Sequence, residues 1–446
     1  MKDYVPSLAL QELEENFSDI APPLNTRAAV LEAQRCLYCY DAPCTKACPT
    51  TINVPAFIRQ IGTGDTLGAA KTILSQNILG GSCARVCPTA VLCEGACVYN
   101  GINGNPIKIG KLQRHAVDAV LEKEVRFFKK GASTGKSVAI VGAGPAGLSC
   151  AHEATRLGYA CTVYEASDRP GGLNTWGVAG YKIDTDFAIS EAQYIAGIGF
   201  EIKFNTPVGE NPSVKHLLDQ YDAVFLAIGL GETAMIGLPG EDLEGCLEAL
   251  DFIRPTRNQN YEGCKVGDRV IVIGAGNTAI DVATAAVRLG AKEVTIVYRR
   301  TEEEMPAYAF EYELAKGDGV RFEWLTQPKR IVGASGRVTG VSCVKVAKVK
   351  QSDGQVKLQE ISGSEFEIAC DVVVMATGQN PLLKLLKEIP GLELKQGSVA
   401  VDPKDYRTSI EGLFAGGDCI KVAEVVNAAA HGRESARAID RFLRER

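Results

Sequence analysis

Short runs of β-branched and other apolar residues recur along the chain from residue 137 onwards. Their unbroken hydrophobicity is typical of parallel strands buried on both faces, and they cover 137–141, 160–164, 223–228, 269–273, 293–297 and 370–376. After the first of them, residues 146–157 carry apolar side chains at helical spacing. Strands that alternate with helices predict an α/β fold with parallel sheets.

The first 130 residues follow a different pattern, in which helical spacing dominates. Residues 1–35 form amphipathic segments interrupted by Pro22-Pro23, and we expect them to pack around the cysteine-rich block that follows. Helical spacing returns at 54–61, 67–75 and 105–126, ahead of a polar linker at 129–136. An α-helical domain is therefore expected before the α/β part.

A third pattern occupies residues 320–360. We expect antiparallel strands here, with a turn at Ser352-Asp353-Gly354, and the strands cover 320–326, 329–334, 338–348 and 356–360. This meander is expected to be an insertion in the second α/β domain. The expected domains are an iron–sulfur domain, the first part of an FAD domain, an inserted NAD(P) domain and the second part of the FAD domain, at 1–130, 131–255, 256–378 and 379–446.

A glycine-rich turn of the form Gly-x-Gly-x-x-Gly links the first strand to its helix. Gly142, Gly144 and Gly147 form this turn, and Glu165 ends the second strand 23 residues after Gly142. In dinucleotide-binding domains such glycines admit a pyrophosphate to the helix N-terminus, and the acid binds a ribose. The sequence predicts a Rossmann-like FAD site that includes Gly142, Ala143, Gly144, Pro145, Ala146 and Glu165.

Two later segments are expected to complete the FAD site. A second glycine turn brings Gly172 and Leu173 to the distance where two-dinucleotide flavoproteins place a turn against FAD. Lys182 follows, either against a phosphate or as an ordinary solvated lysine. Near the C-terminus, Gly417 and Asp418 follow a strand, and we expect Asp418 to face the ribityl chain. The helix after it is expected to point its N-terminus at the pyrimidine end of the flavin.

The pattern of strand, glycine turn and helix repeats from residue 269, with alanine at position 279 in place of the third glycine. Arg299 and Arg300 stand where the first repeat has its acid. Cations there suit the 2′-phosphate of NADP, which favours NADP over NAD, although two solvated arginines give the same pattern. The expected nucleotide contacts are Gly274, Ala275, Gly276, Asn277, Thr278, Arg299, Arg300, Ala376, Thr377 and Gly378.

Composition places limits on the function. The 446 residues, 46% of them hydrophobic and 23% charged, with a mean hydropathy of +0.00, suit a globular protein of several domains. A net charge of -6 argues against a nucleic-acid partner. The longest apolar stretches, such as 223–230, are too short to span a membrane, and the N-terminus has no secretory signal. We expect a cytoplasmic protein, in which clustered cysteines bind metals or carry redox chemistry.

Eight of the 15 cysteines fall between residues 36 and 97. Zinc is one interpretation, but zinc sites usually use separated pairs, whereas the first four of these cysteines lie within thirteen residues. Disulfides are disfavoured by the reducing compartment. Cys48-Pro49 and Cys87-Pro88 have the cysteine–proline pattern of ferredoxins, which favours two [4Fe–4S] clusters.

The glycine turns, the Gly416-Gly417-Asp418 segment and the cysteine block together resemble the NAD(P)H-oxidising part of dihydropyrimidine dehydrogenase. That family is related to the small subunit of glutamate synthase. Residues 41–44 and 83–89 make the dehydrogenase branch the closer match. The chain departs from the family in two places, since Lys182 replaces a flavin-contacting arginine and Pro306 replaces a basic residue of the NADP site.

The resemblance implies interleaved iron ligands. One cluster would be held by Cys36, Cys39, Cys44 and Cys97, and the other by Cys48, Cys87, Cys93 and Gln113. Cys83 would then not be a ligand; the alternative is eight thiolates, with Gln113 at the surface. The glutamate synthase branch has a glutamate at the position of Gln113, so this residue also favours the dehydrogenase branch.

The resemblance further implies an electron-input subunit. NADPH or NADH bound at 274–278 would reduce FAD, and the clusters would carry single electrons to an FMN-containing partner that reduces uracil and thymine. Hydride transfer requires no acid or base, so no catalytic residue is predicted. The competing hypotheses are a glutamate synthase small subunit and a non-catalytic iron–sulfur module that senses redox state. A disulfide reductase is disfavoured because no Cys-x2-Cys pair lies near the flavin segments.

Overall fold

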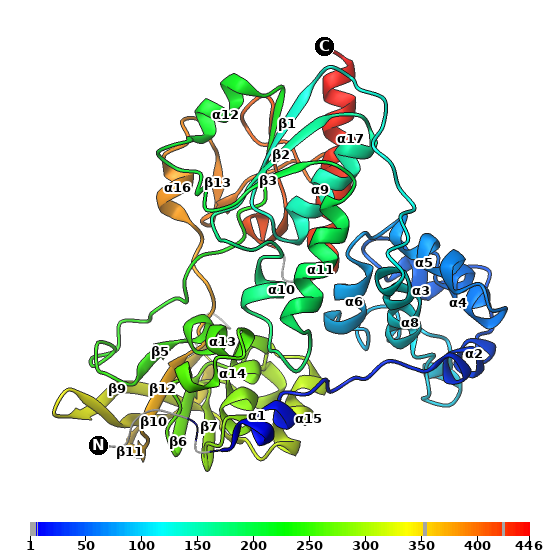
Figure 1. The fold of residues 1–446 in the computed structure, drawn as a ribbon. Helices are drawn as coiled ribbons and strands as arrows, with labels where there is room; N and C mark the ends of the chain where they lie inside the picture. Colours follow the sequence, from blue (N-terminus) through cyan, green and yellow to red (C-terminus); the bar gives the residue numbers. More distant parts are fainter. Residues whose placement is uncertain (1–5, 7, 351–354, 422–423) are drawn as a thin grey trace. The chain divides into compact units, whose positions relative to one another are not determined.

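The computed structural model describes residue 6 and residues 8–350, 355–421 and 424–446 (Figure 1). The chain divides into two compact units. The first unit consists of the segment up to Asp19 together with Trp176–Tyr181 and Gly231–Asn380. The second consists of Ile20–Thr175, Lys182–Leu230 and Pro381–Arg446. None of the described helices is long and apolar enough to cross a membrane.

The second unit begins with the predicted helical region. Its helices are α2 (Thr26–Gln34), α3 (Pro43–Lys46), α4 (Val54–Gly62), α5 (Thr66–Leu74), α6 (Gly80–Val86), α7 (Tyr99–Ile102) and α8 (Ile109–Glu122). Side chains of Asn53 and Asp65 accept backbone hydrogen bonds at the starts of α4 and α5, which satisfies amides that a helix leaves unpaired. Phe57, Ile73 and Leu112 are fully buried in one core. The helical prediction for this region is confirmed.

A parallel five-stranded sheet follows in the same unit, in the order β15-β4-β1-β2-β3. Its strands are β1 (Ser137–Val141), β2 (Ala160–Tyr164), β3 (Glu201–Lys203), β4 (Ala223–Leu226) and β15 (Leu413–Ala415). The helices of this region are α9 (Pro145–Arg156), α11 (Thr185–Ala196), α12 (Val214–Gln220), α16 (Leu383–Lys387) and α17 (Val425–Arg444). Since β15 pairs with β4 across almost 200 residues, the last part of the chain completes the sheet that the first part begins.

Helices α9 and α17 pack unusually closely. A Cβ atom at Gly432 would lie 2.1 Å from the carbonyl oxygen of Ala146, so only glycine fits there. The Ser149 hydroxyl donates a hydrogen bond of 2.7 Å to the Ala429 carbonyl across the same contact. Smaller elements of this region are β13 (Leu394–Lys395), β14 (Ser398–Val399) and η3 (Gly417–Ile420), and α10 (Leu173–Trp176) lies where the chain passes from the second unit to the first.

The first unit contains a second parallel five-stranded sheet, in the order β5-β12-β6-β7-β8. The strands are β5 (Cys246–Glu248), β6 (Arg269–Ile273), β7 (Glu293–Val297), β8 (Arg321–Glu323) and β12 (Val372–Met375). The helices of this unit are α1 (Leu10–Asn16), α13 (Ala249–Arg257), η1 (Tyr261–Gly263), α14 (Asn277–Arg288), η2 (Glu302–Glu304) and α15 (Ala309–Gly317). The predicted α/β class with two Rossmann-like parallel sheets is confirmed.

The antiparallel insertion has three strands, β9 (Thr326–Ala334), β10 (Arg337–Lys350) and β11 (Val356–Ala369). The prediction was wrong for 320–326, because β8 pairs in parallel with β7 of the main sheet. The chain reaches β8 through α15, and such a helical crossover brings a strand back parallel to its neighbour. The predicted turn at Ser352-Asp353-Gly354 lies outside the described residues.

Helix α1 corrects a second expectation. Leu13 and Phe17 are buried in the core of the first unit, and the Phe17 ring lies 5.3 Å from that of Tyr261. The Asn16 side chain donates to the Arg288 carbonyl at 3.0 Å, and Arg288 donates back to the Asn16 carbonyl at 2.8 Å. The segment that contains α1 therefore packs on α14 and not around the cysteine block, whereas α2 does belong to the core of the cysteine region.

Candidate functional site

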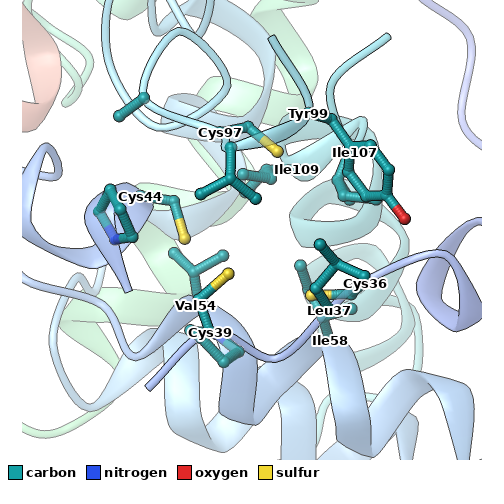
Figure 2. A pocket seen from close by; sticks show the side chains of 14 residues that line it. Cys36, Leu37, Cys39, Cys44, Val54, Ile58, Cys97, Tyr99, Ile107 and Ile109 are labelled. Atoms are coloured by element: carbon teal, nitrogen blue, oxygen red, sulfur yellow. The ribbon is translucent and has the colours of Figure 1, made fainter. Parts of the chain in front are cut away.

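Four thiols of the cysteine block surround one cavity. Cys36 and Cys39 lie on the loop after α2, Cys44 lies in α3, and Cys97 precedes α7. Figure 2 shows their sulfur atoms around a common space, and the apolar part of the lining includes Val54, Ile58, Ile107 and Ile109. This is the set that the family resemblance implies for the first cluster.

The surroundings of these thiols are suited to a metal cluster that replaces protons. Burial raises the pKa of Cys36, and the nearby Cys39 and Cys97 add to this effect. Burial also raises the pKa of Cys44 to about 11. Cys36 and Cys44 are therefore neutral thiols at neutral pH in the absence of metal, and binding of iron must release their protons. Among the described residues, no three His, Cys, Asp or Glu side chains converge closely enough to hold one metal ion. Thiols spaced around a cavity match the ligand type of an iron–sulfur cluster.

The second thiol group consists of Cys48, Cys87 and Cys93. Cys48 follows α3, Cys87 directly follows α6, and Cys93 lies in the loop after α6. Burial raises the pKa of Cys93, and the neighbouring Glu94, Cys48 and Cys44 add to this effect. A hydrogen bond with Cys83 is the main cause that raises the pKa of Cys87, and Cys93 and Cys48 contribute as well. The structure thus brings Cys48, Cys87 and Cys93 together and places Cys83 beside Cys87.

Gln113 is buried on α8, with 8% of its surface exposed, so it is not a surface residue. Its Nε2 donates a hydrogen bond of 2.7 Å to the carbonyl of Gly80, the first residue of α6. Since this bond uses the nitrogen, Oε1 is the amide atom left for an iron ion. The assignment of Gln113 in preference to Cys83 as the fourth ligand stays a prediction.

A buried carboxylate holds α6, the helix that carries Cys83. Glu191 on α11 is 1% exposed, and its Oε1 accepts hydrogen bonds from the amides of Gly81 (2.7 Å) and Ser82 (3.1 Å). Its Oε2 accepts from the Ser82 amide and hydroxyl. These donors are unpaired in the first turn of a helix, so Glu191 satisfies them from the neighbouring α/β region.

The predicted FAD segments form a cradle of glycines. Gly142 has a φ of 103°, and a Cβ atom there would lie 2.4 Å from the Ala227 carbonyl oxygen. At Gly147 a Cβ atom would lie 1.9 Å from the Gly142 carbonyl, so the helix packs on the strand only with glycine. Gly172 has a φ of 57° and approaches Gly144, where its Cβ would meet the Cα at 2.9 Å. The two glycine turns therefore lie side by side and leave backbone open to a pyrophosphate.

Glu165 organises this loop. One carboxylate oxygen accepts a hydrogen bond of 2.7 Å from the Ala143 amide, and the other accepts from the amide and hydroxyl of Ser167 at 2.8 and 2.7 Å. A carboxylate has about four acceptor positions, so a ribose hydroxyl can still bind. Lys182 is half-buried and lies just before α11, which begins at Thr185.

The C-terminal part of the FAD region places Asp418 in a half-buried position. Burial raises the pKa of Asp418 to about 6, and Glu424 adds to this effect. The amide of Gly417 donates a hydrogen bond of 3.4 Å to Nδ1 of His431 on α17, whose ring lies 4.8 Å from that of Tyr406. His431 could not be identified from the sequence, because no motif surrounds it and its partner Gly417 lies 14 residues away along the chain.

The nucleotide segment of the first unit repeats the same geometry. Gly274 has a φ of 126°, and its Cβ would lie 2.2 Å from the Ala376 carbonyl, whereas nothing lies within 4 Å of a Cβ at Gly276. Asn277 accepts a hydrogen bond of 3.0 Å from the Tyr308 amide. Thr377 donates to the Ala234 carbonyl, and the Gly378 carbonyl accepts from the Ala234 amide at 2.7 Å. Of the predicted contacts, Ala275 is buried and Thr278 lies in the first turn of α14.

Arg299 and Arg300 are exposed and follow β7 after one intervening residue, Tyr298. The next residues form a capping box at Thr301 and Glu304, which fixes the direction in which the chain leaves the strand. In dinucleotide-binding domains the end of the second strand faces the adenosine ribose. Exposed guanidinium groups at this point are available to an anionic 2′-phosphate.

Comparisons with known proteins agree with these sites. Residues 136–432 match the pyridine nucleotide-disulphide oxidoreductases, and residues 13–125 match the domain described as dihydropyrimidine dehydrogenase domain II, 4Fe-4S cluster. The chain is 35% identical to the glutamate synthase [NADPH] small chain of Escherichia coli (strain K12), over 98% of this chain and 96% of that protein. It is 33% identical to the NAD-dependent dihydropyrimidine dehydrogenase subunit PreT of Salmonella typhimurium (strain LT2), over 97% and 98% of the two chains.

A solved structure supports the fold of the α/β part. Mycobacterium tuberculosis FprA in complex with NADPH superimposes with a TM-score of 0.58 at 21% identity, over 70% of this chain and 85% of that one. Together with the two family matches, the thiol groups and the glycine cradles agree with a 4Fe-4S cluster domain and a domain that binds FAD and NAD(P). The chain therefore belongs to the family of NAD(P)-dependent electron-transfer subunits that combine a pyridine nucleotide-disulphide oxidoreductase domain with a dihydropyrimidine dehydrogenase-type 4Fe-4S domain.

Proposed function

We propose that the chain is the electron-input subunit of a dihydropyrimidine dehydrogenase. FAD accepts hydride from a nicotinamide cofactor when both are bound, and iron–sulfur clusters accept electrons one at a time. The protein's part is to bind the nucleotide at 274–278, hold FAD against the adjoining glycine turns of Gly144 and Gly172, and keep two clusters in the same compact unit as this cradle. An FMN-containing partner would use the electrons to reduce uracil or thymine.

The observation that carries this proposal is the pair of cysteine groups beside the FAD cradle. The groups at Cys36 and Cys48 belong to the compact unit that also contains the cradle, so electrons can leave the flavin without crossing to the other unit. Gln113 supports the dehydrogenase branch, because the family's glutamate synthase branch has a glutamate at the corresponding position. The buried amide, with its nitrogen bonded to Gly80, suits an oxygen ligand.

The test is purification of the native chain with its partner. We expect FAD, about eight irons per chain from two [4Fe–4S] clusters, and NAD(P)H-dependent reduction of uracil that requires a second, FMN-containing polypeptide. Uracil reduction by the purified chain alone would contradict the division of labour. The absence of iron, or of NAD(P)H-dependent reduction of the flavin, would contradict the electron-input function itself.

A glutamate synthase small subunit is the second candidate, favoured by the 35% identity to the E. coli chain. The same preparation distinguishes the two, because that function predicts a glutamine-dependent partner and formation of glutamate from 2-oxoglutarate. The Gln113→Glu variant adds an internal test, since the glutamate synthase branch should tolerate this change without loss of the second cluster.

We further propose that NADP is the preferred nucleotide. The exposed Arg299 and Arg300 after β7 support this choice, and no acid stands at the end of the strand as Glu165 does in the FAD region. Removal of both guanidinium groups, by substitution with alanine, should raise KM for NADPH about tenfold or more and leave KM for NADH within about twofold. An equal effect on both nucleotides would contradict the proposal.

A further inference from the structure

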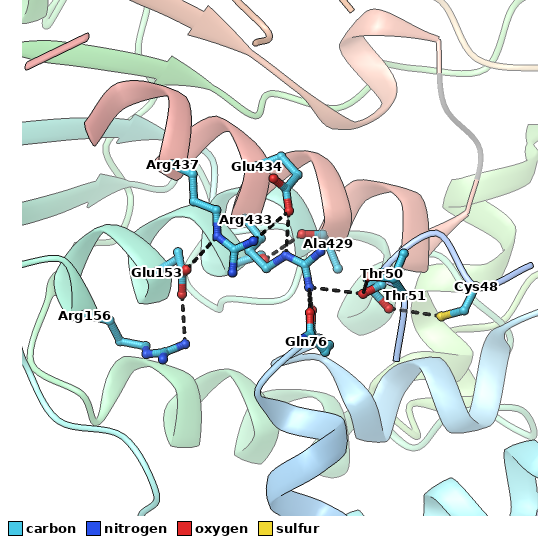
Figure 3. A network of polar contacts seen from close by, with 11 residues as sticks. Cys48, Thr50, Thr51, Gln76, Glu153, Arg156, Ala429, Arg433, Glu434 and Arg437 are labelled. Carbon is cyan, nitrogen blue, oxygen red and sulfur yellow. Dashed lines mark hydrogen bonds and ion pairs between the residues drawn. The ribbon is translucent and has the colours of Figure 1, made fainter. Parts of the chain in front are cut away.

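Arg433 is a buried cation on α17, the helix that packs on the FAD region, and it reaches into the cysteine region. Only 7% of its surface is exposed. Its Nη1 donates to the Thr50 carbonyl at 3.1 Å, to the Gln76 side-chain oxygen at 2.7 Å and to the Gln76 carbonyl. Figure 3 shows the guanidinium among these partners, with Glu434 as its charged neighbour at 2.9 Å from Nε.

The Thr50 carbonyl belongs to the turn that carries Cys48. Cys48 Sγ lies 3.2 Å from the Thr50 hydroxyl, and the Cys48 carbonyl accepts a hydrogen bond of 2.8 Å from the Thr51 amide. Thr51 has a φ of 54°, a left-handed conformation that costs free energy for a β-branched residue. The Thr50 carbonyl between them is bonded by both Arg433 and the Thr51 hydroxyl (2.8 Å). The turn therefore keeps a strained shape with Arg433 as one of its supports.

The residues just before Arg433 contact the FAD region. His431 accepts the hydrogen bond from the Gly417 amide, next to Asp418, and Gly432 packs directly on Ala146 of α9. Three consecutive residues of α17 thus make three different contacts. His431 bonds to Gly417, next to Asp418; Gly432 packs on α9; and Arg433 bonds to the turn that carries Cys48. A helix is stiff over three residues, so the contacts hold the flavin loops and Cys48 at a set separation.

We infer that Arg433 is a positioning residue for electron transfer between the flavin and the cluster that Cys48 ligates. The inference rests on the proposed function, because it requires FAD in the cradle and iron at Cys48. In the transfer one electron leaves FAD that NAD(P)H has reduced, and the oxidised cluster gains that electron. The cluster becomes more negative by one charge, and the buried guanidinium near its ligand favours this state. Arg433 therefore both fixes the Cys48 turn and makes the cluster easier to reduce.

The test compares Arg433→Gln and Arg433→Lys with the matched control Arg437→Gln. Arg437 lies one turn further along α17 and pairs with Glu153 and Glu434, without a contact to the cysteine turn. Each purified holoprotein is assayed for iron and FAD content, for the midpoint potentials of both clusters by EPR-monitored titration, and for the rates of flavin reduction by NADPH and of subsequent cluster reduction.

For Arg433→Gln we expect about a tenfold lower ratio of reduced to oxidised cluster at a fixed potential, for the Cys48 cluster only. That change equals a 59 mV lower midpoint for one electron. Electron arrival at this cluster should slow about tenfold, with flavin reduction by NADPH unchanged. Arg433→Lys should restore the potential, because it keeps the charge, but not the full rate, because an ammonium cannot bond both carbonyls in the same geometry. Arg437→Gln should match the wild type.

Wild-type potentials and rates in Arg433→Gln, with full iron content, would overturn the inference. If that variant loses iron from the Cys48 cluster alone, the support of the turn is demonstrated directly. If Arg433→Gln loses both clusters, the positioning role is tested with Arg433→Lys instead. A wild-type rate of cluster reduction in Arg433→Lys would refute that role. A wild-type protein whose clusters NAD(P)H never reduces would instead refute the proposed function, whatever the variants do.

Discussion

Replacement of Glu191 by alanine should destabilise α6, the helix that ends at the predicted iron ligand Cys87, and lead to loss of iron. The carboxylate of Glu191 satisfies three buried donors, the amides of Gly81 and Ser82 and the Ser82 hydroxyl. In Glu191→Ala all three donors lose their partner within the protein. A buried donor left unsatisfied costs about 1–3 kcal/mol, so the expected loss of stability is about 3–6 kcal/mol if water enters the gap only in part. Domains of this kind have total stabilities of about 5–15 kcal/mol.

Glu191→Gln separates hydrogen bonding from charge. The amide oxygen can still accept from Gly81 and Ser82, and the amide nitrogen can donate to the Ser82 hydroxyl, which then acts as the acceptor. Burial raises the pKa of Glu191, so the native protein gains little from its charge. We expect this variant to lose about 1 kcal/mol or less.

Hydrogen exchange, thermal unfolding and iron content measure the difference. In Glu191→Ala the amides of Gly81 and Ser82 should exchange much faster than in wild type, the thermal midpoint should fall, and iron bound near Cys87 should be lost on desalting. Glu191→Gln should stay close to wild type in all three. Equal behaviour of the two variants, or slow exchange at Gly81 in the alanine variant, would refute the argument that unsatisfied donors cause the loss.

Three further outcomes are expected. Gly432→Ala should lower FAD content and cost about 1–3 kcal/mol, because its Cβ would overlap the Ala146 carbonyl on α9, whereas Gly101→Ala, with open space at its Cβ, should leave both unchanged. Burial raises the pKa of Asp418 from 3.8 to about 6, so the FAD-free fold has its full stability below pH 3.8, where Asp418 is protonated. About 3 kcal/mol of the free energy of unfolding is lost as the pH rises from there through 6. Asp418→Asn should abolish that part of the pH dependence of the thermal midpoint. Cys83→Ser should keep both cluster EPR signals and Gln113→Ala should lose one, whereas loss of a signal in Cys83→Ser alone would reverse the ligand assignment.

Features that depend on a few consecutive residues could be predicted from the sequence. Gly142 and Gly147 are constrained by the turn between one strand and the next helix, so the motif itself contains the reason for each glycine. Short spacing also indicates that Cys36, Cys39, Cys44 and Cys48 lie near one another, whereas the assignment of the first three to one cluster and of Cys48 to the other is implied only by the family resemblance. The structure brings the first three thiols into one cavity together with Cys97.

Features that depend on the choice of a packing partner could not be predicted. The amphipathic pattern of α1 indicates that one face is buried but does not identify α14 as the neighbour. The hydrophobicity of β8 is the same whether its neighbour runs parallel or antiparallel. Glu191 and Arg433 bond to residues 110 and 383 positions away, and a lone buried acid or arginine has no local signature.

The route of the chain between its two compact units affects how the protein folds during synthesis. The chain passes from one unit to the other after residues 19, 175, 181, 230 and 380, so neither unit is a continuous segment. Because α1 is buried on α14, α1 must wait until more than 250 further residues have been translated before its partner exists. Neither unit can be obtained by simple truncation of the gene, and an affinity tag fused near α1 would lie beside the core of the first unit.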